Sequence, residues 1–263
     1  MPLVFSAITP HPPQLLNNQD KPPAELSNTY TAFQLLAGYL YSAKPDLLLV
    51  ITPHGEILPS AWQLLIDDKL HGDLKNFSDF STDLEINGSI GFSHRLKERA
   101  EDHRFQIVLR SGRQLDYASV IPLYFLINHL KSIRIASLIV SGEDVPAHYE
   151  IGKLLREEIF STNERVAVIV SANLSHRLSK DSPGGFSPQG QVFDNKIITA
   201  LKKGLSEDII SISPDLAEEA MTCSLRPIAI LLGALHRKKY HTEILGYEYP
   251  HGVGYCTALL TSH

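Results

Sequence analysis

Three histidines stand just after apolar, β-branched segments of the chain, where an imidazole can ligate a divalent metal or transfer a proton. The pairs of segment and histidine are Leu3–Thr9 with His11, Asp46–Thr52 with His54, and Arg165–Ser171 with His176. If these segments are parallel strands of one sheet, all three imidazoles lie at its carboxyl edge, where open α/β sheets bind their ligands. The sequence therefore predicts one site to which three separate strands contribute.

Two of the histidines have proline neighbours, which restrict the backbone. His11 lies within the proline-rich run Pro10–Pro13, and His54 lies between Pro53 and Gly55. A rigid backbone reduces the entropy that is lost when a metal orders its ligand. The competing interpretation is that proline only ends the strands, because it cannot donate to a ladder, and that each loop histidine is solvated. Both interpretations stay open on these residues alone.

A third, anionic ligand is expected in the C-terminal part of the chain. Non-haem Fe(II) sites combine two histidines with one carboxylate and leave positions for substrate and dioxygen. The candidates are Cys223, which we expect at a helix start that lowers its thiol pKa, and Glu248, which ends an apolar segment. The structural alternatives are a buried small hydrophobe for Cys223 and an exposed strand-end carboxylate for Glu248. A cysteine ligand would also suit zinc or copper.

The composition limits the class of protein. With 263 residues and 43% apolar content, the chain can bury the core of one large α/β domain. A net charge of −5 without a long basic run argues against nucleic acid as a partner, and no apolar stretch is long enough for a membrane helix. Met1 to Pro10 does not read as a signal peptide. Only two cysteines occur, so we expect no disulfide framework and a cytoplasmic location.

Apolar segments alternate with amphipathic ones, which predicts a single α/β domain over residues 1–263 with a central, mostly parallel mixed sheet flanked by helices. Besides the three strands above, we expect strands at Ala61–Asp67, Phe105–Leu109, Ile133–Val140, Thr242–Glu248 and Val253–Leu260. The expected helices are Glu25–Ser42, Leu84–Asp102, Ile121–Leu130, Pro146–Phe160, Phe193–Lys203 and Asp215–His236, the last broken near Pro227. Asn76–Asp83 is expected as a loop, and the Pro-, Gly- and Ser-rich Asp181–Gly190 as a lid or pocket wall.

Short motifs spread over nearly the whole chain resemble one family when they are taken together. They are Ile8-Thr9-Pro10-His11-Pro12-Pro13, Lys44-Pro45-Asp46, Ile51-Thr52-Pro53-His54-Gly55, Pro122-Leu123-Tyr124, Ser171-Ala172-Asn173-Leu174-Ser175-His176-Arg177-Leu178, Phe193-Asp194, Cys223-Ser224-Leu225-Arg226-Pro227 running to Leu232-Gly233-Ala234, and Gly252-Val253-Gly254-Tyr255. In this order they resemble the class III extradiol ring-cleavage dioxygenases of the LigB type and their Memo-like relatives.

The resemblance implies roles for individual residues. His11 and His54 match the two metal-ligand histidines, and His176 matches the catalytic histidine. The dioxygenases have glutamate as the third ligand, whereas this chain has Cys223 there, as the Memo-like proteins do. The resemblance therefore favours Cys223 over Glu248.

Two positions depart from the dioxygenase pattern. Where the dioxygenases have Asp-His-Gly, this chain has Asp116-Tyr117-Ala118, so Tyr117 replaces a second active-site histidine and is expected to donate to a bound oxygen species. Asn173 stands where the family has an aspartate three residues before the catalytic histidine. We expect Asp116 and Asn173 to support the site beside the substrate, and the lost aspartate charge to leave the pKa of His176 without that influence.

The resemblance implies Fe(II)-dependent cleavage of a catechol-type aromatic ring by dioxygen, with His176 as acid or base. One alternative is a Memo-like, redox-linked protein that binds zinc or copper without cleaving a ring. A metal-dependent hydrolase, with His176 as proton shuttle, is the other. The expected partners are a small aromatic substrate and dioxygen, with a second copy or a small partner subunit, and without nucleic acid or membrane.

Overall fold

The computed structural model describes residues 2–16, 22–130 and 132–262; the outermost residues of the predicted domain, Met1 and His263, lie outside them. The strands are β1 (Leu3–Thr9), β2 (Leu47–Thr52), β3 (Trp62–Leu65), β4 (Lys69–Leu74), β5 (Asp79–Gly88), β6 (Ile107–Arg110), β7 (Arg134–Ile139), β8 (Val166–Ser171), β9 (Tyr240–Glu248) and β10 (Tyr255–Ser262). The α-helices are α1 (Ser27–Ala43), α2 (Ile90–Asp102), α3 (Tyr117–Leu126), α4 (Val145–Ser161), α5 (Pro188–Lys203), α6 (Ser206–Ile210), α7 (Pro214–Ala220) and α8 (Leu225–Ala234). Three short 3-10 turns are η1 (Pro13–Leu16), η2 (Ala24–Leu26) and η3 (Lys75–Phe77).

The strands form one mixed sheet in the order β4-β5-β7-β2-β8-β1-β10-β9, with β3 beside β7 and β6 beside β3. The central run from β5 through β7, β2 and β8 to β1 is parallel. Antiparallel pairing joins β4 to β5, β3 to β7, β10 to β1 and β9 to β10. The prediction of an α/β fold with a mostly parallel mixed sheet is therefore confirmed.

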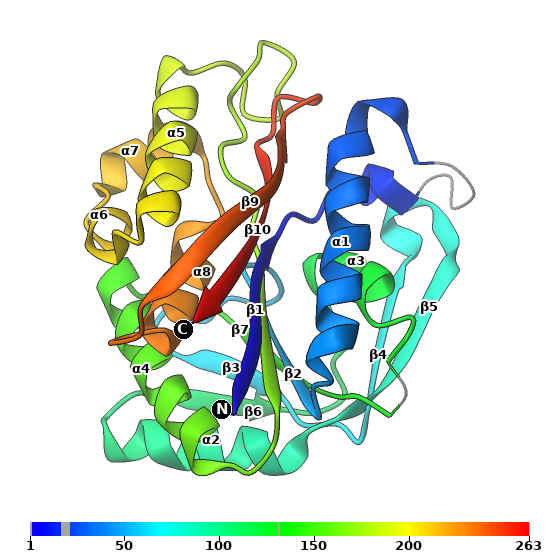
Figure 1. Cartoon of the computed structure of the whole chain (residues 1–263), viewed down its shortest axis with the longest axis vertical. Helices are drawn as coiled ribbons and strands as arrows, with labels where there is room; N and C mark the ends of the chain where they lie inside the picture. Colours follow the sequence, from blue (N-terminus) through cyan, green and yellow to red (C-terminus); the bar gives the residue numbers. More distant parts are fainter. Residues whose placement is uncertain (1, 17–21, 131, 263) are drawn as a thin grey trace.

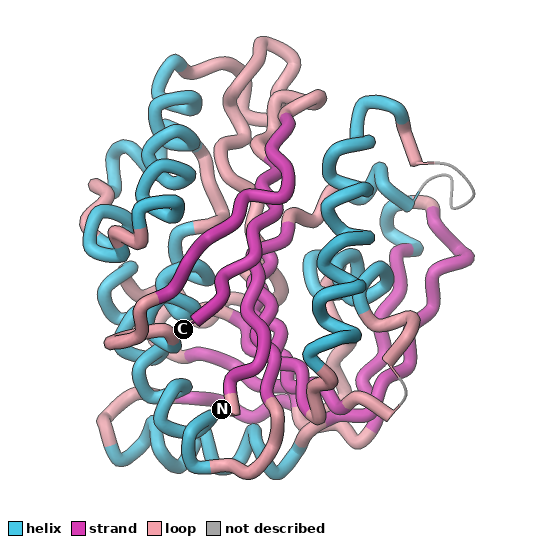
Figure 2. The backbone as a smooth tube through the Cα atoms, in the orientation of Figure 1, coloured by secondary structure: helices cyan, strands magenta, loops and turns pink. Residues whose placement is uncertain are grey.

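Helices cover both faces of this sheet, as the alternation along a central strand requires. In β2, Leu47, Leu49 and Ile51 join the core beneath α4, α5 and α8, whereas Leu48 and Val50 join the core beneath α1 and α3. Figure 1 shows the two groups of helices on either side of the strands, and Figure 2 shows the strands passing between them. No helix in the described part of the chain is both long and apolar enough to cross a membrane.

The predicted loop Asn76–Asp83 and the first part of the predicted helix Leu84–Asp102 are wrong. β5 occupies residues 79–88, and α2 begins only at Ile90. Residues 79–88 form a strand because they pair with β4 in a hairpin that we did not predict from the sequence. In β4, Leu70 and Leu74 point into the core, whereas Lys69 and His71 are exposed. A polar strand such as β5 is held by its neighbours rather than by its own propensity.

The predicted helix Asp215–His236 is two helices, and the break lies earlier than Pro227. α7 ends at Ala220, Met221 adopts a left-handed conformation with φ of 51°, and α8 begins at Leu225. Pro227 lies in the first turn of α8, where a missing N–H removes no helical hydrogen bond. The break leaves Cys223 in the connection between the two helices.

Candidate metal centre

The first two histidine-bearing loops leave the same edge of the sheet on either side of β8. β8 lies between β1 and β2, and its register aligns Ser171 with Thr9 and Val170 with Ile51. The carboxyl ends of the three strands are therefore level at one edge of the sheet. Each histidine follows two residues after its strand, and the structure brings His11 and His54 together there.

His11, His54 and Cys223 converge on a small volume. Their ligand atoms all lie within 4.8 Å of one another; the two Nε2 atoms are 3.3 Å apart, and Cys223 Sγ is 3.8 Å from His11 Nε2. Metal bonds of about 2.0–2.3 Å at tetrahedral angles separate the ligand atoms by about 3.3–3.6 Å. The separation of the two Nε2 atoms lies in this range and that of Cys223 Sγ from His11 Nε2 is slightly longer, so the three side chains are candidate ligands of one divalent ion.

Ser171 sets the direction of the buried His11 ring. Its hydroxyl donates to the carbonyl of Ala118 at 2.6 Å and lies 2.8 Å from His11 Nδ1. Because that hydroxyl has a single proton, it accepts from Nδ1–H of the imidazole. The lone pair of His11 is then on Nε2, the atom that faces His54 and Cys223, as a metal ligand requires.

The His54 loop is held by Thr52 and Asp116. Its backbone N–H donates to Thr52 Oγ1 at 3.2 Å, and Thr52 Oγ1 donates to Asp116 at 2.8 Å. Asp116 caps α3 by accepting from the backbone of Ala118 and Ser119. The Tyr117 hydroxyl lies 3.0 Å from His54 Nε2, so the predicted site residue Tyr117 is beside the cluster.

Cys223 is tied to the β1 loop through Asn173. The backbone N–H of Asn173 donates to Cys223 Sγ at 3.3 Å, and its side-chain Oδ1 accepts from the backbone N–H of His11 at 3.0 Å. Asn173 therefore joins two members of the cluster. Its side-chain oxygen accepts from the His11 backbone, so Asn173 supports the β1 loop, and its expected lack of a charge effect on His176 stays a prediction.

The protonation of the cluster follows from burial. Burial, and then the proximity of His54 and His176, lowers the pKa of His11, and burial lowers the pKa of His54 against the opposing effect of Asp116. Both imidazoles are then neutral near pH 7, which is the ligating form. The expected lowering of the Cys223 pKa is wrong, because burial raises it to about 12 despite the nearby start of α8. A bound cation would reverse this balance by stabilising the thiolate.

Glu248, the alternative third ligand, is committed elsewhere. Its carboxylate accepts from the backbone N–H of Thr29 at 2.7 Å, in the first turn of α1. A carboxylate at that position compensates the exposed N–H groups of the helix start. It is not a member of the cluster that the described residues form.

His176 lies near the cluster without joining it. The proximity of His176 helps to lower the pKa of His11. The pKa of His176 is itself lowered, mainly by burial and to a smaller extent by His54. The backbone of His176 bonds to Ala220 and Gly184, which anchors its loop. Its Nδ1 atom is buried and has no hydrogen-bond partner among the described residues.

A cavity of about 720 Å³ opens against the cluster, with His54 and Cys223 in its wall. Most of the remaining wall is apolar, with side chains such as Ile57, Val140 and Leu225. This size and lining are those of a pocket for a small organic molecule.

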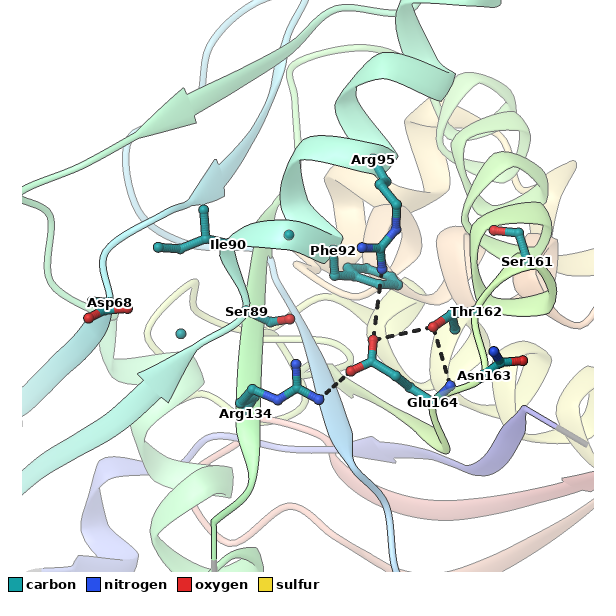
Figure 3. Close-up of a pocket in the computed structure, with 12 residues that line it drawn as sticks. Asp68, Ser89, Ile90, Phe92, Arg95, Arg134, Ser161, Thr162, Asn163 and Glu164 are labelled. Atoms are coloured by element: carbon teal, nitrogen blue, oxygen red, sulfur yellow. Dashed lines mark hydrogen bonds and ion pairs between the residues drawn. The ribbon is translucent and has the colours of Figure 1, made fainter.

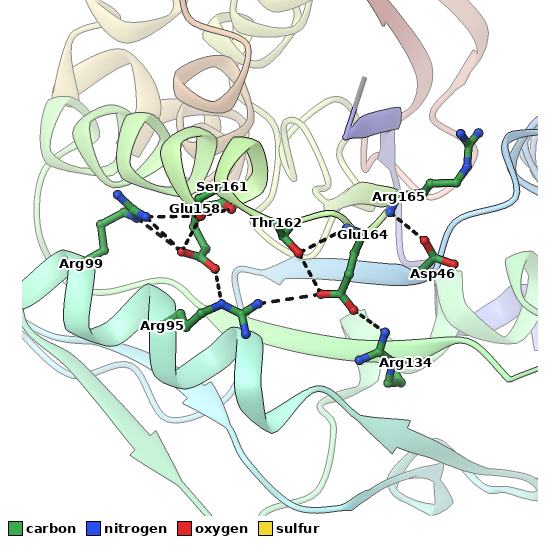
Figure 4. A network of polar contacts seen from close by, with 9 residues as sticks. All are labelled: Asp46, Arg95, Arg99, Arg134, Glu158, Ser161, Thr162, Glu164 and Arg165. Carbon is green, nitrogen blue, oxygen red and sulfur yellow. Dashed lines mark hydrogen bonds and ion pairs between the residues drawn. The ribbon is translucent and has the colours of Figure 1, made fainter.

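A second cavity, of about 560 Å³, lies at the opposite edge of the sheet, where β7 and β8 begin (Figure 3). Glu164 pairs there with Arg95 and Arg134. Figure 4 shows the network continuing to Glu158, which is buried and lies 2.7 Å from Arg95 and 3.3 Å from Arg99. Because these charges neutralise one another, the network fastens α2 to α4 and β7.

Sequence reasoning missed Ser171 and Thr52, which orient the two histidines. Each is the last residue of an otherwise apolar strand, Val166–Ser171 and Leu47–Thr52. A hydroxyl at that position was the available signal, because it stands at the carboxyl edge where ligands bind.

Comparisons with known proteins agree with this architecture. Residues 6–258 match the family described as the catalytic LigB subunit of aromatic ring-opening dioxygenase. The chain is 29% identical to protein CA_C1420 of Clostridium acetobutylicum, covering 94% of this chain but 55%, about half, of that protein. It is 25% identical to the 2-aminophenol 1,6-dioxygenase beta subunit of a Pseudomonas species, over 83% of this chain and 80% of that one. The crystal structure of an uncharacterized protein, JW3007, from Escherichia coli K12 has a similar fold, with a TM-score of 0.71 at 16% identity over 97% of this chain and 99% of that one.

Proposed function

The chain belongs to the LigB family of catalytic subunits of aromatic ring-opening dioxygenases, and from this premise we propose that it is an Fe(II)-dependent extradiol dioxygenase acting on a catechol-type diol. The observation that carries the proposal is the convergence of His11, His54 and Cys223, of which His54 and Cys223 lie in the wall of a largely apolar cavity. Two neutral imidazoles and one thiolate form a donor set that suits a divalent transition metal.

When bound, Fe(II) would supply a centre that holds the two oxygens of a diol and binds dioxygen beside them. The chain's own residues prepare that centre. Ser171 fixes the His11 ring, and Asn173 holds Cys223 against the β1 loop. The hydrogen bond between Thr52 and Asp116 fixes the loop that carries His54. Such support keeps ligands in a productive geometry before any ion arrives.

Two side chains are proposed to handle protons. Because burial lowers its pKa, His176 is neutral near pH 7 and can accept a proton from a diol hydroxyl. Burial raises the pKa of Tyr117, so its hydroxyl stays protonated and acts as a hydrogen-bond donor beside His54. The apolar wall of the cavity limits the access of water to the reacting ring.

The Pseudomonas relative is named as a beta subunit, and a companion subunit or a second copy of this chain belongs to the proposal. The mass of the native protein in solution, measured with and without co-purifying chains, tests that part.

The central test is the metal content of protein purified without oxygen. We expect close to one iron per chain in the wild type, and a loss of most of it in His11→Ala, His54→Ala and Cys223→Ala. Cys256→Ala and Glu248→Ala are matched controls, because Cys256 is fully buried in β10 and Glu248 caps α1. Both controls should keep the metal.

Oxygen uptake with catechol completes the test. Uptake that depends on iron and falls in His176→Ala at unchanged metal content supports the proposal. Stoichiometric metal with no uptake for any diol contradicts the dioxygenase, and loss of metal only in Glu248→Ala contradicts the assigned ligands.

A further inference from the structure

The start of helix α2 opens into the second cavity, at the edge of the sheet opposite the candidate metal centre. Ile90, Gly91 and Phe92 form the first turn of this helix and line the cavity. Their backbone N–H groups have no acceptor in the helix, because those acceptors would precede its start, and none among the other described residues. Three donors at the positive end of the helix dipole therefore lie at this cavity without partners.

Ser89, which precedes α2, adds a fourth donor that does not belong to the helix. Its side chain makes no capping hydrogen bond to the first turn, whereas Asp144 caps α4 in that way. Ser89 is only 4% exposed, and its hydroxyl has no partner in the described part of the chain. Figure 3 shows this hydroxyl pointing into the cavity. A buried hydroxyl without a partner costs free energy, so a ligand that accepts from it is stabilised there.

Arg95 brings a guanidinium over the same helix start. Its Nε donates to Glu158 at 2.7 Å, and its Nη2 lies 3.8 Å from Glu164. Its Nη1 has no partner among the described residues and lies 3.4 Å from the position that a Cβ of Gly91 would take. Guanidinium N–H groups beside free backbone N–H groups at a helix start are suited to a phosphate group.

The carboxylates of the cavity wall restrict the kind of ligand that can gain from these donors. Glu164 pairs with Arg134 and, at a longer distance, with Arg95, so the ion-pair network is neutral as a whole. Asp68 lies at the other end of the cavity from Arg95 (Figure 3). A ligand is therefore held by the number of its acceptor atoms rather than by net charge, and a phosphate group offers several strong acceptor oxygens at once.

We propose that this cavity is a binding site for a phosphate group, held by Ser89, Arg95 and the backbone N–H groups at the start of α2. The volume of about 560 Å³ is larger than one phosphate ion requires, so the site has room for the free ion or for the phosphoryl group of a small organic molecule. The inference does not depend on the proposed dioxygenase, because the site lies at the other edge of the sheet.

The test is a calorimetric titration of the metal-free protein with inorganic phosphate and with glycerol phosphate. Metal-free protein is used because phosphate could otherwise bind to an ion at the metal centre. We expect wild type to bind at least one of the two with a Kd of about 1 mM or tighter. A tighter Kd for the ester identifies the phosphoryl group of an organic molecule as the ligand, and a tighter Kd for inorganic phosphate identifies the free ion.

Two variants should weaken binding, and one matched variant should not. Ser89→Ala removes one donor to the anion, so we expect its Kd to rise at least about fivefold. Gly91→Asp places a carboxylate beside Arg95 and should abolish binding, while a negative charge in the first turn supports the helix. Ser93→Ala is the control, because Ser93 is buried in the same helix with an unpartnered hydroxyl but does not line the cavity. It should keep the wild-type Kd.

Glu164→Gln should change the affinity in the opposite direction. It removes the negative charge nearest to the two arginines and keeps polar atoms for hydrogen bonds. Because the repulsion of the anion is lost, we expect the Kd to fall at least about threefold. Urea titration of each variant establishes that it is folded.

Three results would overturn the site. They are the absence of binding by wild type for both phosphates, a Kd that stays unchanged in Ser89→Ala and Gly91→Asp, and an equal loss of affinity in Ser89→Ala and Ser93→Ala. If Gly91→Asp does not fold, the comparison of Ser89→Ala with Ser93→Ala decides.

Discussion

Replacing Ser171 by alanine tests whether the histidine geometry depends on its support. The substitution leaves Nδ1–H of His11 and the carbonyl of Ala118 without their partner, and both are buried. An unsatisfied buried polar group costs about 1–3 kcal/mol, so for these two groups we expect the free energy of unfolding to fall by about 2–6 kcal/mol. Metal affinity should fall by roughly 10–100-fold, because the ring loses the bond that fixes its direction.

The assay has two parts and an internal control. Urea titration of the metal-free protein gives the loss of stability, and competition with a chelator of known affinity gives the loss of metal binding. Ser137→Ala is the matched variant, because Ser137 is equally buried in β7 but its hydroxyl has no partner among the described residues. Because this variant removes a buried hydroxyl that has no partner, it should not lower stability and should raise it by up to about 1–3 kcal/mol, with metal affinity unchanged. A Ser171→Ala protein that equals Ser137→Ala in both measurements would refute the orienting role of Ser171.

Further predictions concern packing and pH. In Gly152→Ala a new Cβ would lie 2.2 Å from the Ile230 carbonyl, where α4 crosses α8. We expect the free energy of unfolding, measured by urea titration, to fall by about 3 kcal/mol or more. The control is Gly38→Ala in α1, whose Cβ meets no atom within 4 Å, so its free energy of unfolding should be unchanged or rise by up to about 1 kcal/mol. Burial raises the pKa of Asp194 from 3.8 to about 6, so the folded protein binds the extra proton and stability should fall by about 3 kcal/mol as the pH rises from about 4 to 6. We therefore expect the unfolding free energy of wild type minus that of Asp194→Asn to fall between about pH 4 and pH 6 and to be constant above about pH 7. A difference that does not change with pH over this whole range would contradict the prediction.

The sequence predicted the parts of the fold that carry a strong local pattern. β2 and β8 are unbroken apolar runs ended by a hydroxyl residue, so their existence, and the edge at which their loops emerge, followed from the residues. The β4–β5 hairpin could not be predicted in the same way. Residues 79–88 are largely polar, and their conformation depends on pairing with Lys69–Leu74 and with β7.

The residues of the candidate site were likewise predicted only in part from local sequence patterns. His11 and His54 were predicted from their position after strands, and the structure brings them within hydrogen-bond distance. Cys223 was favoured over Glu248 only through a family resemblance, because a cysteine near a helix is ordinarily a small buried hydrophobe. Its place beside His11 depends on the break between α7 and α8, which the prediction set at Pro227 instead.

The hydrogen bonds around the cluster explain how three distant segments form one centre. Ser171 joins β8 to the β1 loop and to α3, Asn173 joins the β8 loop to His11 and Cys223, and Asp116 joins α3 to the end of β2. Each of these residues satisfies backbone groups at a strand or helix end that would otherwise be buried without partners. The same bonds that the fold needs for stability therefore fix the ligand directions, so the loss of one should lower stability and metal affinity together.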